Sequence, residues 1–357
     1  MIPETELARE DQSAPPLRER IEEIVKHRLG APAAGLLLSP APQLPVGVLT
    51  VGPAQAAVST ARFRVYPGVG WERCARLGVL AAASGAAATG LPLQCLAVSL
   101  SVPPSTTEKN LTDFWRRVHR EATKLGVGVA ANTTVVDPFG SLPDAGVCTA
   151  LAMGEGVPFV TAGTALPGDL LVMTRSAGIE AAALIALVCE QDIAENLGEG
   201  FAEDAAQMYR SLSTMMECGA ARRAGIGPQC VTAMHNAGAA GVLRGIQTMA
   251  RASGLGFEFD RGQMLLTDEV DAILTHAEID PLVTASQGVL LLTCRPSAES
   301  RLRYELDQTG VGCAVFGRVS DEFKGVRALN EGRALDVDGL TDRRLPHILA
   351  GALREQQ

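Results

Sequence analysis

The stretch VTAMHNAGAAGVL, residues 231–243, holds polar and small residues in a pattern that could bind an anion. An apolar run passes through a turn into a helix, and such a turn aims backbone N–H groups and the positive end of the helix dipole at one point. A dinucleotide fingerprint needs three glycines as GxGxxG, but Asn236 takes the first place and leaves only Gly238 and Gly241. Taken alone, these glycines indicate a closely packed strand-to-helix connection.

Three further residues are candidates for chemistry on their position alone. His235 is expected in the same turn, but no second histidine or cysteine lies at ligand spacing and no carboxylate stands beside it, which favours a structural role. Glu180, in AGIE, is predicted in the first turn of a helix, where its charge suits the dipole. Asp169 follows Gly168 and is predicted as a turn aspartate.

The composition describes an ordinary globular chain with an acidic surplus. Its 357 residues are 47% hydrophobic and 20% charged, enough for two domains with their own cores. Lysine and arginine total 31 against 40 aspartates and glutamates, a net charge of −9, which argues against nucleic acid or an anionic membrane as partner. The eight cysteines form no CxxC pair, which indicates buried thiols in a reducing cytoplasm rather than a zinc site.

The elements that must position these residues follow from periodicity and turn signals. The polar, acidic residues 1–16 contain no apolar signal segment and are predicted as a disordered lead-in. The first half then alternates strands and helices, with two strands around the turn GPAQ (52–55) and a boundary near residue 165. We expect helices over 17–30, before Gly90, over 106–126 and from 179 to about 222, and strands at CLAVSLSV, GVGVAANTTVVDP, LLVMTR, LGFEF, VLLLTC and GCAVFGRV.

In chain order, several blocks resemble the family that contains aminoimidazole ribotide (AIR) synthase, selenophosphate synthetase and the hydrogenase-maturation protein HypE. The blocks are GPAQAAV, AAASGAAATGLPL, LSVPPSTTEKNL, LGVGVAANTTVV, PGDLLVMTRSAGIEAAALIA, VTAMHNAGAAGVLRGIQTMARASGLGFEFD and ASQGVLLLTCRP. They span about residues 20–330, and they look most similar to HypE-like, AIR synthase-related proteins.

The resemblance implies a two-domain PurM-like fold of α/β plus α+β type. Its N-terminal α/β domain (17–165) would pair its strands with a second copy to form a dimer barrel, and its C-terminal α+β domain (166–330) would cover it, followed by a tail with a helix (331–357). In active relatives, Mg-ATP sits between the domains. Glu180 matches a family position, which implies a ligand role, and Ser286 matches a serine near the substrate; the alternative for Ser286 is a loop serine.

The sequence departs from the family pattern where acidic ligands are expected. The paired aspartates fall on Ala54 and Gln55, and the next aspartate falls on Ser84 or Gly85. The glycine-rich loop reads Ala130, Ala131, Asn132, Thr133, and the HDPTxGG-like motif reads HNAGAAG, with Asn236 in place of aspartate. Because Mg²⁺ with a triphosphate needs anionic oxygen ligands, tight Mg-ATP binding in the familiar geometry is not expected.

The tail also departs from HypE proper, which carries its substrate group on a C-terminal cysteine. LPHILAGALREQQ (345–357) has no cysteine and reads as an amphipathic helix.

Three functions remain open from the sequence. The first is a homodimeric HypE-like accessory, regulatory or assembly protein with an eroded Mg-ATP site, acting with a paralogue or a maturation-type protein. The second is an ATP-dependent enzyme that activates a carbonyl, amide or acid oxygen, with Gln55, Asn132 and Asn236 replacing carboxylates. The third is a protein that binds an uncharged small molecule in the interdomain cleft. No metal ligand or cofactor is predicted under the first or third.

Overall fold

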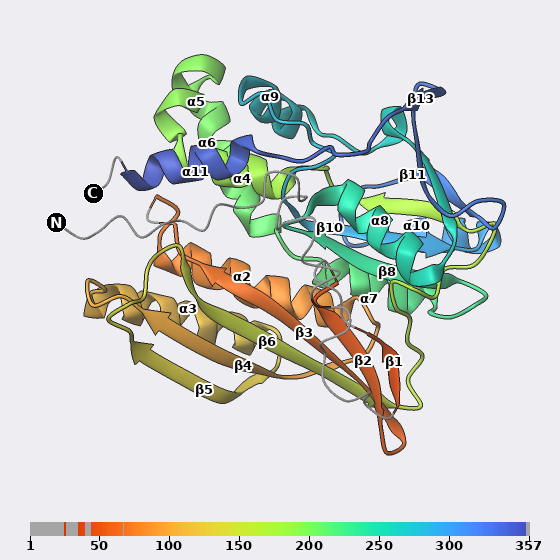
Figure 1. Cartoon of the computed structure of the whole chain (residues 1–357), viewed down its shortest axis with the longest axis horizontal. Coiled ribbons are helices and arrows are strands. Elements are labelled where there is room, and N and C mark those ends of the chain that lie inside the picture. Colours follow the sequence, from red (N-terminus) through yellow and green to blue (C-terminus); the bar gives the residue numbers. More distant parts are fainter. Residues whose placement is uncertain (1–24, 26–34, 40–43, 67, 355–357) are drawn as a thin grey trace, which may run out of the picture.

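The computed structural model describes residues 25, 35–39, 44–66 and 68–354. The predicted lead-in over 1–16 and nearly all of the helix predicted over 17–30 lie outside the described residues. The described chain builds two mixed sheets, one from each half of the sequence, with helices on their faces (Figure 1). None of its described helices is both long enough and apolar enough to cross a membrane.

The first sheet has the order β1-β2-β3-β6-β4-β5, antiparallel except for the β4–β5 pair. Its strands are β1 (Leu36–Leu38), β2 (Val46–Val51), β3 (Ala54–Arg64), β4 (Leu93–Val102), β5 (Gly128–Val136) and β6 (Asp144–Glu155). The helices α2 (Trp71–Ala87) and α3 (Glu108–Lys124) lie side by side on one face of the sheet (Figure 1). A threonine caps the second helix, since the Thr107 side chain accepts the Asn110 N–H.

An aromatic cluster fills the core between this sheet and its helices. The rings of Phe63 and Phe114 lie 4.9 Å apart edge to face, and Trp71 packs on Phe114 at 6.2 Å. Gly78 lets α2 approach this cluster, because a Cβ there would lie only 2.3 Å from the Phe63 ring. The close approach of α2 to β3 therefore depends on a missing side chain.

The second sheet has the order β13-β12-β9-β11-β7-β10-β8 and is antiparallel except for the β9–β12 pair. Its strands are β7 (Leu170–Thr174), β8 (Val231–Gly238), β9 (Gly256–Asp260), β10 (Ser286–Cys294), β11 (Cys313–Ser320), β12 (Gly325–Asn330) and β13 (Arg333–Leu335). The α-helices of this half are α4 (Ile179–Val188), α5 (Glu190–Leu197), α6 (Glu199–Gln207), α7 (Met215–Ala224), α8 (Gly241–Ser253), α9 (Asp268–His276), α10 (Glu299–Asp307) and α11 (Arg344–Arg354). The described short 3₁₀ helices are η1 (Met208–Ser211), η2 (Arg261–Gln263) and η3 (Pro296–Ala298).

Strand β10 is buried along its whole length because helices cover both of its faces. Val289 and Leu291 join the core that contains α4 and α8, while Leu290 and Leu292 join the core that contains α7 and α10. The continuous apolar run VLLLTC is typical of a strand buried on both sides. Helix α2 contacts both β8 and α7, so it connects the two halves.

Two predicted turns are wrong. The segment GPAQ was predicted as a turn, but β3 begins at Ala54, so Gln55 lies in a strand and only Gly52 and Pro53 turn the chain. His235 and Asn236 were placed in a strand-to-helix turn, but β8 continues through Gly238. In both cases pairing with a neighbouring strand extends the element into small and polar residues that look like a turn in the sequence.

Candidate functional site

The interface between the two halves contains a network of polar side chains, the interface network, that begins at Asn236 in β8. Its Nδ2 donates a hydrogen bond to Oε1 of Gln287, which stands at the start of the neighbouring strand β10, at 2.8 Å. Asn236 Oδ1 and Gln287 Nε2 are buried and have no partner among the described residues. The two amides therefore keep unused hydrogen-bonding capacity in the interior.

The interface network continues to Glu180 in the first turn of α4. The backbone N–H of Gln287 donates to Glu180 Oε2 at 2.9 Å. Burial raises the pKa of Glu180, and the Gln287 N–H and the positive charge of Arg64 offset only part of this effect. Because Arg64 ends β3 in the first half, Glu180 lies where the two halves meet.

Ser286 supports the interface network. Its Oγ accepts the N–H of Gly178, the residue before α4, at 3.0 Å and donates to the Thr284 carbonyl at 2.9 Å. Gly178 has a left-handed φ of 75°. The hydroxyl thus fixes the beginning of α4, which in turn positions Glu180.

His235, next to Asn236 in β8, is buried, and burial lowers its pKa to about 4. The imidazole is therefore neutral at physiological pH. Ser84, at the candidate metal-ligand position, is also buried and accepts the backbone N–H of Thr214 at 3.1 Å. This bond ties α2 to the beginning of α7.

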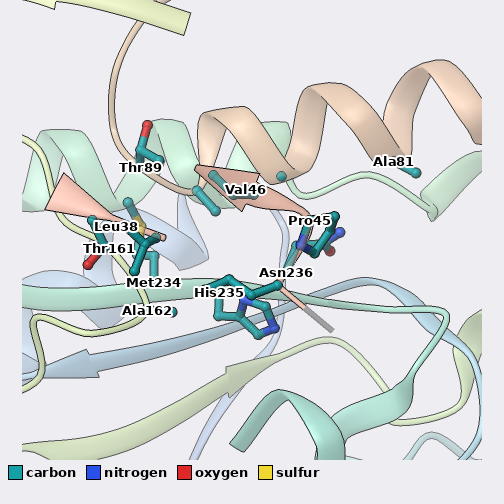
Figure 2. A pocket seen from close by; sticks show the side chains of 13 residues that line it. Leu38, Pro45, Val46, Ala81, Thr89, Thr161, Ala162, Met234, His235 and Asn236 are labelled. Atoms are coloured by element: carbon teal, nitrogen blue, oxygen red, sulfur yellow. The ribbon is translucent and has the colours of Figure 1, made fainter. Parts of the chain in front are cut away.

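A small cavity of about 40 Å³ lies between the halves, beside Gly85 of α2 and Asn236 of β8 (Figure 2). This volume suits a few water molecules and is far below the roughly 300–1,000 Å³ of typical ligand pockets. The Ser59 hydroxyl, buried and without a described partner, lies against Gly85, where a Cβ would be 2.3 Å from its Oγ. Gly85 is therefore required for close packing.

The other predicted site residues do not join the interface network. Gln55 lies on the same strand as Ser59 but four residues nearer the β2–β3 hairpin, about 13 Å away along β3. Asn132 and Thr133 are exposed on the edge strand β5, and Asn132 Oδ1 accepts the Thr134 hydroxyl at 2.9 Å. The structure brings together Glu180, Ser286, Asn236 and, beside it, His235.

The two glycines of the opening motif serve the backbone. Gly238 ends β8 with φ 59°, and Gly241 begins α8 with φ 84°. A Cβ at Gly241 would lie 2.6 Å from the Thr284 carbonyl oxygen. Both positions therefore require glycine for their conformation, and Gly241 also for close approach to the segment before β10.

Sequence reasoning missed Gln287 and Arg64. Gln287 could have been found, because it is a lone amide within the apolar block ASQGVLLLTC. Arg64 carried no such signal, since its relation to Glu180 depends on how the two halves pack.

The donor set does not fit Mg-ATP in the manner that the family resemblance implies. The interface network supplies two amides, one hydroxyl and one carboxylate whose pKa is raised. Within the described ranges, no group of three or more histidines, cysteines, aspartates or glutamates is placed to hold a metal ion. Mg²⁺ prefers octahedral oxygen ligands that include carboxylates, so we derive no chemical step through the metal.

The chain has relatives that are recognisable by profile and by structure. Residues 167–330 match the family described as AIR synthase related protein, C-terminal domain. Among curated proteins, none matches the chain by sequence.

Solved structures are similar over most of their own length. HypE of E. coli superposes with a TM-score of 0.68 at 20% identity, covering 82% of this chain and 88% of HypE. A ThiL structure, complexed with AMPPCP and TMP, gives 0.67 at 16% identity, covering 91% and 97%. A crystal structure of a HypE–HypF complex gives 0.61 at 18% identity, covering 82% and 92%.

These similarities agree with the arrangement of two mixed sheets and their helices. Residues 167–330 are similar to AIR synthase related C-terminal domains, and the described chain has the PurM-like fold seen in HypE and ThiL.

Proposed function

We propose that this protein is a cytoplasmic, homodimeric accessory or assembly protein of HypE-like fold that works without Mg-ATP catalysis. The observation that carries this proposal is the use of the interface side chains for structure. Ser84 holds the Thr214 N–H, Ser286 holds the beginning of α4, and Glu180 holds the Gln287 N–H. Residues at or beside the expected ligand positions thus connect strands and helices.

Charge accounting supports the same proposal. A bound Mg²⁺–triphosphate requires several anionic ligands, whereas Gln55, Ser84 and Asn236 are neutral at the positions in question. The remaining carboxylate, Glu180, has a raised pKa, so its ionised form is disfavoured. Gln55 and Asn132 lie on strands away from the interface network. This argues against their acting with Asn236 as substitute ligands.

The homodimer is supported by an uncovered face of the first sheet. Helices α2 and α3 cover one face, and no described helix covers the other (Figure 1). Val147 on that face is 38% exposed and lies between Arg62 and Ser99 on the adjacent strands, and Val58, Ala97 and Leu151 are partly exposed farther along the same face. A sheet face that no helix covers and that exposes apolar side chains among polar ones is typical of a protein–protein interface.

A protein partner is supported by analogy only. HypE, which shares the fold, has been crystallised with HypF. A maturation-type protein or a paralogue of this chain is the corresponding partner that we propose here.

Isothermal titration calorimetry with Mg-ATP tests the proposal. We expect no saturable heat at micromolar concentration that depends on Asn236. Micromolar binding that disappears in Asn236→Ala but persists in Asn132→Ala would overturn the proposal in favour of an ATP-using enzyme. The control is matched, because it removes the same amide from the exposed strand β5.

A second candidate is favoured by the unused polar atoms at the interface. Asn236 lines the cavity of about 40 Å³ and bonds to Gln287, so their unused Oδ1 and Nε2 atoms could bind only an uncharged molecule of a few non-hydrogen atoms with both donor and acceptor groups. Native mass spectrometry of the purified protein checks this. A retained neutral ligand that is lost in Gln287→Leu supports the candidate, and a ligand-free spectrum contradicts it.

A further inference from the structure

A second and larger pocket lies outside the interface, at the beginning of α2 and α3. Its volume is about 490 Å³, against about 40 Å³ for the interface cavity. It falls within the size range of pockets that bind small molecules. The wall consists of two adjacent helix N-terminal segments and Tyr209 of η1.

Cationic side chains from both helices line this pocket. They are Arg73 of α2 and Lys109 and Arg117 of α3, against the carboxylates of Glu72 and Asp113. Three positive charges against two negative ones leave a local surplus in a protein whose net charge is −9. The Arg73 guanidinium lies over the Tyr209 ring, 5.5 Å from its centre, which fixes the cation at the pocket wall.

The beginning of α2 adds backbone donors. Its N-cap is Gly70, which provides no side-chain cap, so the first N–H groups of a 17-residue helix are left for another acceptor. These groups and the helix dipole favour an anion at the end of the helix that lines the pocket.

Arg117 adds a fixed cation to the pocket wall. It is 9% exposed, and its Nε is buried without a described acceptor. Its Nη atoms are held by Glu72 at 3.1 Å and Glu121 at 3.1 Å, which fixes the guanidinium plane. With both Nη atoms already paired, Arg117 contributes a fixed positive charge to the pocket wall rather than a free fork.

The titration of Tyr209 agrees with a positive field in this pocket. Burial alone would raise the pKa of Tyr209. A hydrogen bond with Arg210 and the charges of Arg117, Arg210 and Arg73 outweigh burial and lower that pKa below its ordinary value. The field therefore favours a negative group beside the phenol.

We propose that this pocket binds a phosphorylated small molecule, with Arg73, Lys109 and the beginning of α2 contacting the phosphate. The two acidic residues do not oppose this, because each is already paired with cations. Glu72 pairs with Arg117 and Arg120, and Asp113 pairs with Lys109 and Arg116. The pocket is separate from the interface network around Asn236, so the proposal does not depend on whether Mg-ATP binds at the interface.

The test uses inorganic pyrophosphate as the probe, measured by calorimetry at low and moderate salt. We expect saturable binding that weakens as salt increases. Arg73→Gln and Lys109→Gln each should weaken binding about tenfold or more, because each removes a charge-assisted contact. Both residues are exposed, so their replacement leaves the fold intact.

Arg222→Gln is the matched control, since it removes one exposed arginine from α7, outside the pocket. It should leave the pyrophosphate affinity unchanged. No saturable binding by the unaltered protein, or an equal loss in the control, would overturn the proposal. Equal affinity for citrate would overturn the assignment of phosphate.

Discussion

At the scale of single residues, burial sets the charge of the polar groups in the interior. His235 lies buried in β8, and desolvation alone lowers its pKa from 6.5 to about 4. The unfolded chain therefore binds one more proton than the folded protein between these two pH values. The stability contributed by neutral His235 is present above pH 6.5 and is lost as the pH falls toward 4.

This predicts an acid-dependent loss of up to about 3 kcal/mol in the free energy of unfolding, from roughly 2.5 pKa units. Urea unfolding from pH 7.5 to 4.5 measures it. His235→Gln should flatten the slope, whereas His119→Gln, at an exposed position, should keep it. An unchanged slope in His235→Gln would contradict the assignment.

Arg175, which is partly exposed, and Glu217, which is buried, form an ion pair whose two partners are not equivalent. Arg175 Nε donates to Glu217 Oε1 at 2.5 Å, while Glu217 Oε2 has no described partner. Arg175 also has a left-handed φ of 56°. Glu217 is wholly buried, and burial raises its pKa despite the arginine.

Arg175→Ala should destabilise the protein by about 3–5 kcal/mol at neutral pH, because it leaves a buried carboxylate unpaired. The loss should shrink as the pH falls, because burial raises the pKa of Glu217 and so favours its neutral form in acid. Arg318→Ala is the control: its partner is Glu258, its side chain is 71% exposed, and it should cost about 1 kcal/mol or less. Thermal melts at pH 7.5 and 5 check both, and equal losses in the two variants would refute the expected asymmetry.

How far sequence predicts the site depends on which signal each residue carries. Asn236, Glu180 and Ser286 were found through local motifs, and the structure places them in one chain of contacts around Gln287. Gln55 was placed at a candidate site by its motif alone. Its strand register puts it near a hairpin instead, and register depends on the partner strand rather than on local sequence.

At the scale of elements, the packing of α2 on β3 depends on glycines. Gly78 faces Phe63, and a methyl group there would lie 2.3 Å from the ring. The ring is fully buried and contacts Phe114, so it has little room to move.

Gly78→Ala should therefore cost about 1–3 kcal/mol through overpacking. Gly219→Ala in α7 is the matched control, because its Cβ would meet only the Arg223 side chain at 3.6 Å. That change should be neutral or stabilise by up to about 1 kcal/mol. Chemical denaturation measures both, and stabilisation by Gly78→Ala would contradict the packing described for α2.

Helices and buried strands were the elements that sequence predicted best. The helix begun by Thr107 and the strand VLLLTC carry a cap and a continuous apolar run, and both are confirmed. The ends of β3 and β8 were wrong because Ala, Asn and Gly at those ends have weak strand preference, and only the neighbouring strands hold them extended.

At the scale of the whole molecule, the proposed dimer depends on the uncovered face of the first sheet. Lysines in place of Val147 and Leu151 would put two charges from each subunit into an apolar interface. The double variant should change a dimer into a monomer of 37.3 kDa.

Sedimentation velocity at micromolar concentration measures this change. Leu340→Lys is the control, because it alters an exposed leucine in the second half of the chain. A monomeric unaltered protein would contradict the proposed dimer.

The aromatic cluster of α2 and α3 has a spectroscopic consequence. The chain has two tryptophans, Trp71 and Trp115, and both lie in this layer, so the second sheet contains none. Tryptophan fluorescence, excited selectively over tyrosine, therefore reports on the first half alone, whereas far-ultraviolet circular dichroism reports on both. Fluorescence and dichroism melts recorded on one sample would coincide if the halves unfold together and separate if they do not.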